Sequence, residues 1–146
     1  MSNPHADFHG YKAFNKNWMC LNRQYTCPGE FRSNHLPSLC QTGMHFCLQL
    51  EEVFWFYGYD LRKIHVAEVE AFGSVAFGEN KCSTDGLRII KELSISDILQ
   101  NVDQQTVILI AKINGLELIF ESPNIDKIIG YRKQHWSTYG EVILFN

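Results

Sequence analysis

Residues 48–71 read LQLEEVFWFYGYDLRKIHVAEVEA, and the spacing of apolar residues changes part-way along this stretch. In residues 48–57 the apolar positions lie at i, i+3, i+4 and i+7, which is one face of a helix: Leu50, Val53, Phe54 and Tyr57. Gly58 is a suitable stop for that helix. In residues 63–71 the side chains alternate instead, as expected of a strand. The stretch therefore predicts a helix followed by a strand.

Strands are also predicted on both sides of this stretch. Towards the N-terminus, residues 8–14 form a strand and residues 15–42, rich in Asn, Pro, Gly and Ser, hold short strands and turns. Towards the C-terminus, further strands are expected at 74–77 and 87–93. Ser94 and Asp97 have the spacing of a capping pair, so a short helix is predicted to begin at Ser94.

The last third of the chain predicts a hairpin, a helix and a strand. Residues 106–113 are a nearly continuous β-branched and apolar run, typical of a central strand. Asn114-Gly115 before the apolar run 116–120 is a hairpin signal. Ser122-Pro123 predicts a helix running to Lys133, and residues 141–145 a final strand. The predicted fold class is α+β, a mixed, mainly antiparallel sheet with about three helices packed on it.

Length and composition predict one soluble domain over residues 1–146. The chain is 45% hydrophobic and 20% charged, which is ordinary globular usage, and its net charge of −3 makes a nucleic-acid partner unexpected. It has neither a membrane-spanning apolar run nor a signal-peptide pattern. Five cysteines, an odd number, favour free thiols in a reducing cytoplasm.

A series of motifs between residues 11 and 93 carries a family resemblance. The series opens with Tyr11-Lys-Ala-Phe-Asn-Lys16, contains Cys40-x-x-Gly-x-His-Phe-Cys47 and the strand 64–73, and closes with Lys91-Glu-Leu93. This order resembles an uncharacterised family common in phage and prophage genomes, labelled only as a domain of unknown function. The resemblance implies a family-like core at residues 11–93 and an extension at residues 94–146. It also implies a small phage-type accessory protein in the host cytoplasm and implies no particular chemistry.

Cysteine and histidine side chains cluster in one part of the chain: Cys20, Cys27, His35, Cys40, His45 and Cys47. Their spacing is wider than that of ordinary zinc knuckles, and free buried cysteine is common as a small apolar residue. Buried thiols with a hydrogen-bonded histidine are therefore expected and no metal is assigned. Zinc on Cys20, Cys40, His45 and Cys47 remains an open alternative.

A second set of residues resembles the His…Tyr…Glu order of ADP-ribosyltransferase-like folds. It comprises His9-Gly10 on the first strand, Gly43-Met-His45-Phe46 before the helix that carries Tyr57, and Glu141 on the last strand. The resemblance implies NAD as cofactor. His9 would position the ribose, Tyr57 would stack on nicotinamide and Glu141 would stabilise the sugar centre, while Gly10, Gly43, His45 and Phe46 would bind the cofactor.

Two further features suggest binding surfaces. Five aromatic residues fall outside the predicted core stripes, namely Trp18, Trp55, Tyr59, Tyr131 and Trp136, and each is either an edge of the core or part of a binding face. A basic run, Lys127, Arg132, Lys133 and His135, is expected on a solvated face of the last helix. The leading hypothesis is a phage accessory protein without a cofactor that binds a host protein, with inhibition of a host defence component as one form of this hypothesis. The alternative is an NAD-dependent transferase, and a third hypothesis is self-association through the extra hairpin.

Overall fold

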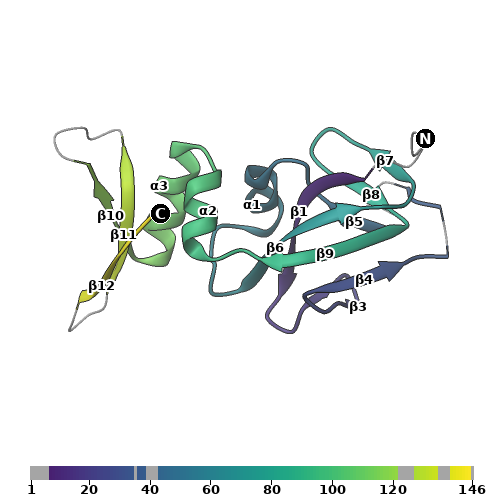
Figure 1. The fold of residues 1–146 in the computed structure, drawn as a ribbon, viewed down its shortest axis with the longest axis horizontal. Helices are drawn as coiled ribbons and strands as arrows, with labels where there is room; N and C mark the ends of the chain where they lie inside the picture. Colours follow the sequence, from purple (N-terminus) through teal and green to yellow (C-terminus); the bar gives the residue numbers. More distant parts are fainter. Residues whose placement is uncertain (1–6, 35, 39–42, 122–126, 135–138, 146) are drawn as a thin grey trace. The chain divides into compact units, whose positions relative to one another are not determined.

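The chain folds into two compact units in a computed structural model that describes residues 7–34, 36–38, 43–121, 127–134 and 139–145. Unit 1 comprises residues 1–58 and 63–93, and unit 2 comprises residues 59–62 and 94–146 (Figure 1). The boundary at residues 93 and 94 lies where the sequence predicts the change from core to extension. That the whole chain behaves as a single domain stays a prediction.

Unit 1 is built from antiparallel strands. A four-stranded sheet has the order β1 (Phe8–Asn15), β6 (Ile64–Ala71), β9 (Gly86–Glu92) and β4 (Gly29–Arg32). A three-stranded sheet has the order β5 (Met44–Phe46), β8 (Cys82–Thr84) and β7 (Val75–Phe77), and β2 (Met19–Cys20) pairs with β3 (Arg23–Gln24). The backbone of Tyr11 on edge strand β1 exchanges hydrogen bonds of 2.7 and 2.8 Å with Cys47, directly after β5.

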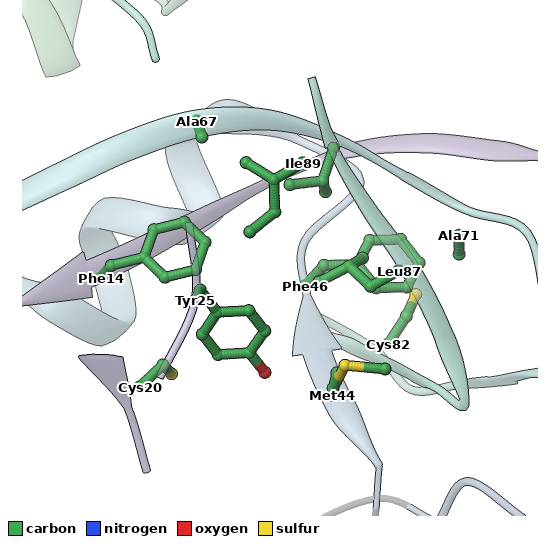
Figure 2. Close-up of a cluster of buried hydrophobic side chains, with 11 residues drawn as sticks. Phe14, Cys20, Tyr25, Met44, Phe46, Ala67, Ala71, Cys82, Leu87 and Ile89 are labelled. Carbon is green, nitrogen blue, oxygen red and sulfur yellow. The ribbon is translucent and has the colours of Figure 1, made fainter. Parts of the chain in front are cut away.

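Strand register explains which side chains form the core of unit 1. Lys12 lies opposite Ala67, and Val69 lies opposite both Gly10 and Ile89, so these positions share one face of the sheet. That face is covered by a buried cluster that draws on β1, β2, β5, β6, β8 and β9: Phe14, Cys20, Tyr25, Met44, Phe46, Ala67, Val69, Ala71, Cys82, Leu87 and Ile89 (Figure 2). Residues far apart in sequence therefore make one apolar centre.

The predicted helix at 48–57 is confirmed as α1 (Leu50–Tyr57), which packs against β1. Its buried residues include Leu50, Val53 and Phe54, three positions of the predicted stripe. The Glu52 carboxylate accepts a 2.9 Å hydrogen bond from the Gln49 N–H, which satisfies a free donor at the helix start. Gly58 follows the helix with φ of 82°, a conformation that favours glycine.

Unit 2 combines two helices with a separate three-stranded sheet. The helices are α2 (Ile95–Asn101) and α3 (Gln104–Asn114), and the sheet has the order β10 (Leu116–Phe120), β11 (Ile128–Gln134) and β12 (Tyr139–Leu144). The predicted cap of α2 is confirmed, since the Ser94 hydroxyl accepts from the Asp97 N–H and the Asp97 carboxylate accepts from the Ser94 N–H, both at 3.1 Å.

The predicted central strand at 106–113 is wrong, because these residues form α3. The Asp103 carboxylate accepts a 2.8 Å hydrogen bond from the Thr106 N–H and caps the helix start. Gly115 then ends the helix in the left-handed conformation, with φ of 64°. Asn114-Gly115 is thus a helix C-terminus, although residues 116–120 form a strand as predicted.

The predicted helix running to Lys133 is also wrong. Residues 128–134 form β11, which pairs with β10 and β12. The predicted N-cap at Ser122-Pro123 lies outside the described residues. Lys127 therefore precedes a strand, and its ammonium lies 3.3 Å from the Glu121 carboxylate. Arg132 is on β11, and its guanidinium lies 3.8 Å from the carboxylate of Glu117 on β10.

The predicted fold class needs the same correction. The described residues form four small sheets whose strands pair antiparallel, and their three helices contain only 8, 7 and 11 residues. The fold is therefore more β-rich than a mixed sheet covered by helices, because its strands form several small sheets and its helices are short. None of the helices among the described residues is long and apolar enough to span a bilayer.

Candidate functional site

Unit 1 contains a pocket of about 320 Å³ between the edge of β1, the strand β5 and the C-terminal half of α1. Five of its lining residues carry rings: Tyr11, His45, Phe46, Phe56 and Tyr57. The others are Lys12, Leu21, Cys47 and Lys81. A small cavity with aromatic walls and a few polar groups is typical of a ligand site.

Lys12 is the most unusual residue of this pocket, because its side chain is only 2% exposed. Its ammonium group donates to the His45 carbonyl and to the Cys20 sulfur, the latter at 3.5 Å. It also lies 5.7 and 5.4 Å from the ring centroids of Phe14 and Tyr25. Loss of water around the buried group lowers the pKa of Lys12, and the neighbouring Cys20 offsets this only in part.

Cys20 connects Lys12 to the end of α1. Its sulfur lies 3.4 Å from the Tyr57 hydroxyl, so a lysine, a thiol and a phenol follow one another at hydrogen-bond distance. Burial raises the pKa of Tyr57, and its hydrogen bond to Cys20 raises it further. Burial also raises the pKa of the Cys47 thiol to about 12, which makes Cys47 a poor nucleophile near neutral pH.

His45 and Lys81 bring polar groups to the same pocket. Burial lowers the pKa of His45, and the positive charges of Lys12 and Lys81 lower it further, so the imidazole is neutral at physiological pH. The Lys81 ammonium lies 5.8 Å from the ring centroid of Phe56, a favourable position for a cation. No carboxylate of the described residues forms an ion pair with Lys81. Its charge is therefore available to an anion.

Leu21 reaches the pocket from the turn between β2 and β3. Leu21 and Asn22 have φ of 49° and 68°, the left-handed pair that a two-residue hairpin turn requires. A leucine is unfavourable in this conformation, and this one is also 77% exposed. An exposed apolar side chain in a strained turn at a pocket wall is consistent with a role in ligand contact.

The predicted transferase residues do not all meet in this pocket. His45, Phe46 and Tyr57 line it, as the cofactor reading expects. His9 is not among the lining residues, and its ring bonds to the Glu68 carboxylate at 2.7 Å. Glu141 lies on β12 in unit 2, so its convergence with His9 and Tyr57 stays a prediction.

The two predicted glycines have structural explanations. An ideal Cβ built on Gly10 would lie 2.7 Å from Cδ2 of Phe46, so the phenylalanine ring packs directly on the Gly10 backbone. Gly43 has φ of 95°, and a Cβ built there would lie 3.0 Å from the Thr84 carbonyl oxygen. Both glycines shape the surroundings of β5 and neither lines the pocket itself.

The predicted cysteine and histidine cluster is only partly described. Cys20, Cys27, Cys47 and Cys82 are free thiols, while His35 and Cys40 lie outside the described residues. Within the described ranges, no three His, Cys, Asp or Glu side chains are grouped so that they could hold a metal ion. The alternative of zinc on Cys20, Cys40, His45 and Cys47 is not tested, because Cys40 lies outside the described residues.

The predicted aromatic surface divides in two. Trp55 is 59% exposed, as a binding face requires, whereas Tyr131 is buried. Trp18 stacks on His65 with ring centroids 4.3 Å apart and is half-buried at the core edge. Tyr59 is also half-buried, and Trp136 lies outside the described residues. Among the four described members of this group, Trp55 alone is exposed enough to contact a large partner.

Comparison with known proteins gives a family and no activity. A family model described as a domain of unknown function (DUF7666) matches residues 8–101. No match is found among curated proteins or among solved structures. The predicted resemblance to an uncharacterised family is confirmed at this level, and the match extends beyond residue 93 to the end of α2.

Proposed function

The chain belongs to the DUF7666 family, whose description states no activity, so we propose a function from the pocket of unit 1 itself. We propose that unit 1 binds a small ligand that combines a flat ring with an anionic group, as nucleotides do. One observation carries this proposal: a pocket of about 320 Å³ has aromatic walls and contains Lys81, which forms no ion pair with a carboxylate of the described residues.

The size and chemistry of the pocket support this ligand class. Its volume is at the lower end of the range for ligand pockets, about 300–1,000 Å³, so it suits one ring and its substituent better than a dinucleotide. Tyr11, Phe56 and Tyr57 offer ring faces or edges to such a ligand. Lys81 offers a cation to a phosphate or carboxylate.

The nicotinamide half of NAD is the first ligand to test, because His45, Phe46 and Tyr57 were expected at a nicotinamide site and line this pocket. The proposal concerns binding. Transfer chemistry with His9 and Glu141 is a separate prediction, since His9 does not line the pocket and Glu141 belongs to unit 2.

Calorimetric titration with nicotinamide mononucleotide tests the proposal, with the riboside as the matched ligand that lacks phosphate. Lys81→Met is expected to weaken binding of the mononucleotide about tenfold, since a charged hydrogen bond contributes about 1.5–3 kcal/mol. Its affinity for the riboside should not change. Phe56→Ala should weaken both ligands, while Trp55→Ala, a neighbour outside the pocket, should weaken neither. The proposal would be refuted if the wild-type protein bound neither the mononucleotide nor the riboside.

We propose as a second candidate that the protein acts in the cytoplasm of a phage-infected host by binding a host protein. Trp55 and Phe56 support it, because adjacent aromatic residues on α1 are 59% and 50% exposed, and exposed aromatic residues mark binding hot spots. Pull-down from host lysate should retain a stoichiometric partner that Trp55→Ala loses. Failure of the wild-type protein to retain any partner in several hosts would count against this candidate.

A further inference from the structure

We propose that Lys12 is a covalent site, whose amine condenses with the carbonyl carbon of an aldehyde ligand held in the pocket of unit 1. The inference rests on the proposed ligand pocket and adds a reactive group to it. The ligand class is a small aldehyde with a ring and an anionic substituent.

The position of Lys12 is the first argument. Lys12 is one of the residues that line the pocket, and it lies on the face of β1 that carries the buried cluster, opposite Ala67. It is therefore held in place by packing while one side remains next to the cavity. A fixed lysine beside a ligand cavity has the geometry that imine formation needs.

The partners of Lys12 are the second argument. A buried ammonium is normally paired with a carboxylate, because an isolated buried charge is costly. No Asp or Glu among the described residues forms an ion pair with Lys12. Its nearest polar partners are the Cys20 sulfur and the His45 carbonyl. These surroundings favour the neutral amine, in agreement with the lowered pKa of Lys12, and only the neutral amine is a nucleophile.

The chemical step requires no oxidant or reductant. The nitrogen lone pair attacks the carbonyl carbon, a C–N bond forms, and the π electrons of the C=O bond move to oxygen, which takes a proton lost by nitrogen. The resulting carbinolamine loses water to leave a C=N bond, so amine and aldehyde give imine and water. Cys20 and Tyr57 follow Lys12 at 3.5 and 3.4 Å, and this thiol and phenol are placed to relay the protons.

Two aldehydes and a borohydride trap test the inference on the full chain. Pyridoxal 5′-phosphate supplies a ring and an anion, while propanal supplies neither, and borohydride reduces either imine to a stable secondary amine. Peptide mapping by mass spectrometry then identifies the labelled lysine in the wild-type protein. Lys12 should be labelled in preference to the exposed Lys63. As the pH is raised, labelling of Lys12 should reach half its maximum at a lower pH than labelling of Lys63. Lys12→Met should lose the adduct, whereas Lys63→Arg should retain it.

The outcomes separate this inference from the proposed function. Labelling of Lys12 by both aldehydes, with nicotinamide mononucleotide competing against pyridoxal 5′-phosphate, supports both. Labelling of Lys12 by propanal alone supports the reactive amine and contradicts the ring-and-anion pocket. Binding of the mononucleotide without preferential labelling of Lys12 by either aldehyde overturns the covalent site and leaves the pocket intact.

Discussion

Replacing Phe46 with alanine is expected to lower the free energy of unfolding by about 3–5 kcal/mol, the usual cost of removing a buried phenylalanine. The Phe46 side chain is 2% exposed and belongs to the cluster of unit 1 shown in Figure 2. Its ring packs on the backbone of Gly10, where no side chain can move in to fill the space. The cavity would therefore remain open. Urea denaturation of the two proteins at the same pH measures the difference.

Phe56→Ala is the matched control for this substitution, because Phe56 lines the same pocket but is 50% exposed. It should change stability by no more than about 0.5 kcal/mol, as is usual for surface positions. The two substitutions distinguish Phe46, a pocket residue that stabilises the fold, from Phe56, a pocket residue expected to contact only the ligand. A loss below about 1 kcal/mol for Phe46→Ala would mean that the core is not packed as described.

Lys12→Met is expected to stabilise the protein by about 1–3 kcal/mol at pH 6, the range found for removing a poorly compensated buried polar group. Methionine has a similar length and fills the space without a charge. The loss of the hydrogen bond to the His45 carbonyl offsets part of the gain.

The gain from Lys12→Met should shrink as the pH rises. Burial lowers the pKa of Lys12 below its ordinary value of 10.5. At pH values between the lowered pKa of Lys12 in the folded protein and its ordinary pKa of 10.5, the unfolded chain keeps the lysine proton and the folded chain releases it. The stability of the wild-type protein therefore rises with pH in this window. The variant lacks this dependence. Thermal or urea unfolding of both proteins from about pH 6 to just above pH 10.5 checks it, and a difference that stays constant or grows with pH across this range would show that Lys12 is not destabilised by burial.

The elements that sequence reasoning predicts correctly are those with a clear hydrophobic period. α1 has an apolar stripe beside Glu51 and Glu52, and β6 alternates along its length. α3 has no such contrast between a polar and an apolar side, because its exposed side also carries apolar residues: Ile108, Leu109 and Ile113. A nearly continuous β-branched and apolar run then favours a strand, although the cap at Asp103 and the glycine at 115 make it a helix.

The candidate site is harder to predict than the fold, because its residues come from five separate segments. His45, Phe46 and Tyr57 can be found from a resemblance, but Lys12, Leu21 and Lys81 cannot. One sequence pattern indicates that Lys12 is buried. It lies two residues from both Gly10 and Phe14 in a predicted strand, so its side chain is on the side of the strand that carries buried residues. A lysine on the buried side of a strand is rare enough to suggest a specific role.

A titration of isotope-labelled protein with nicotinamide mononucleotide, followed by amide NMR shifts, addresses the ligand pocket of unit 1 directly. The account predicts saturable shifts, with one common dissociation constant, at the amides of Lys12, His45 and Tyr57, and none of that size in β10 or β12 of unit 2. Shifts that are absent at saturating ligand, or that are largest in unit 2, would contradict it.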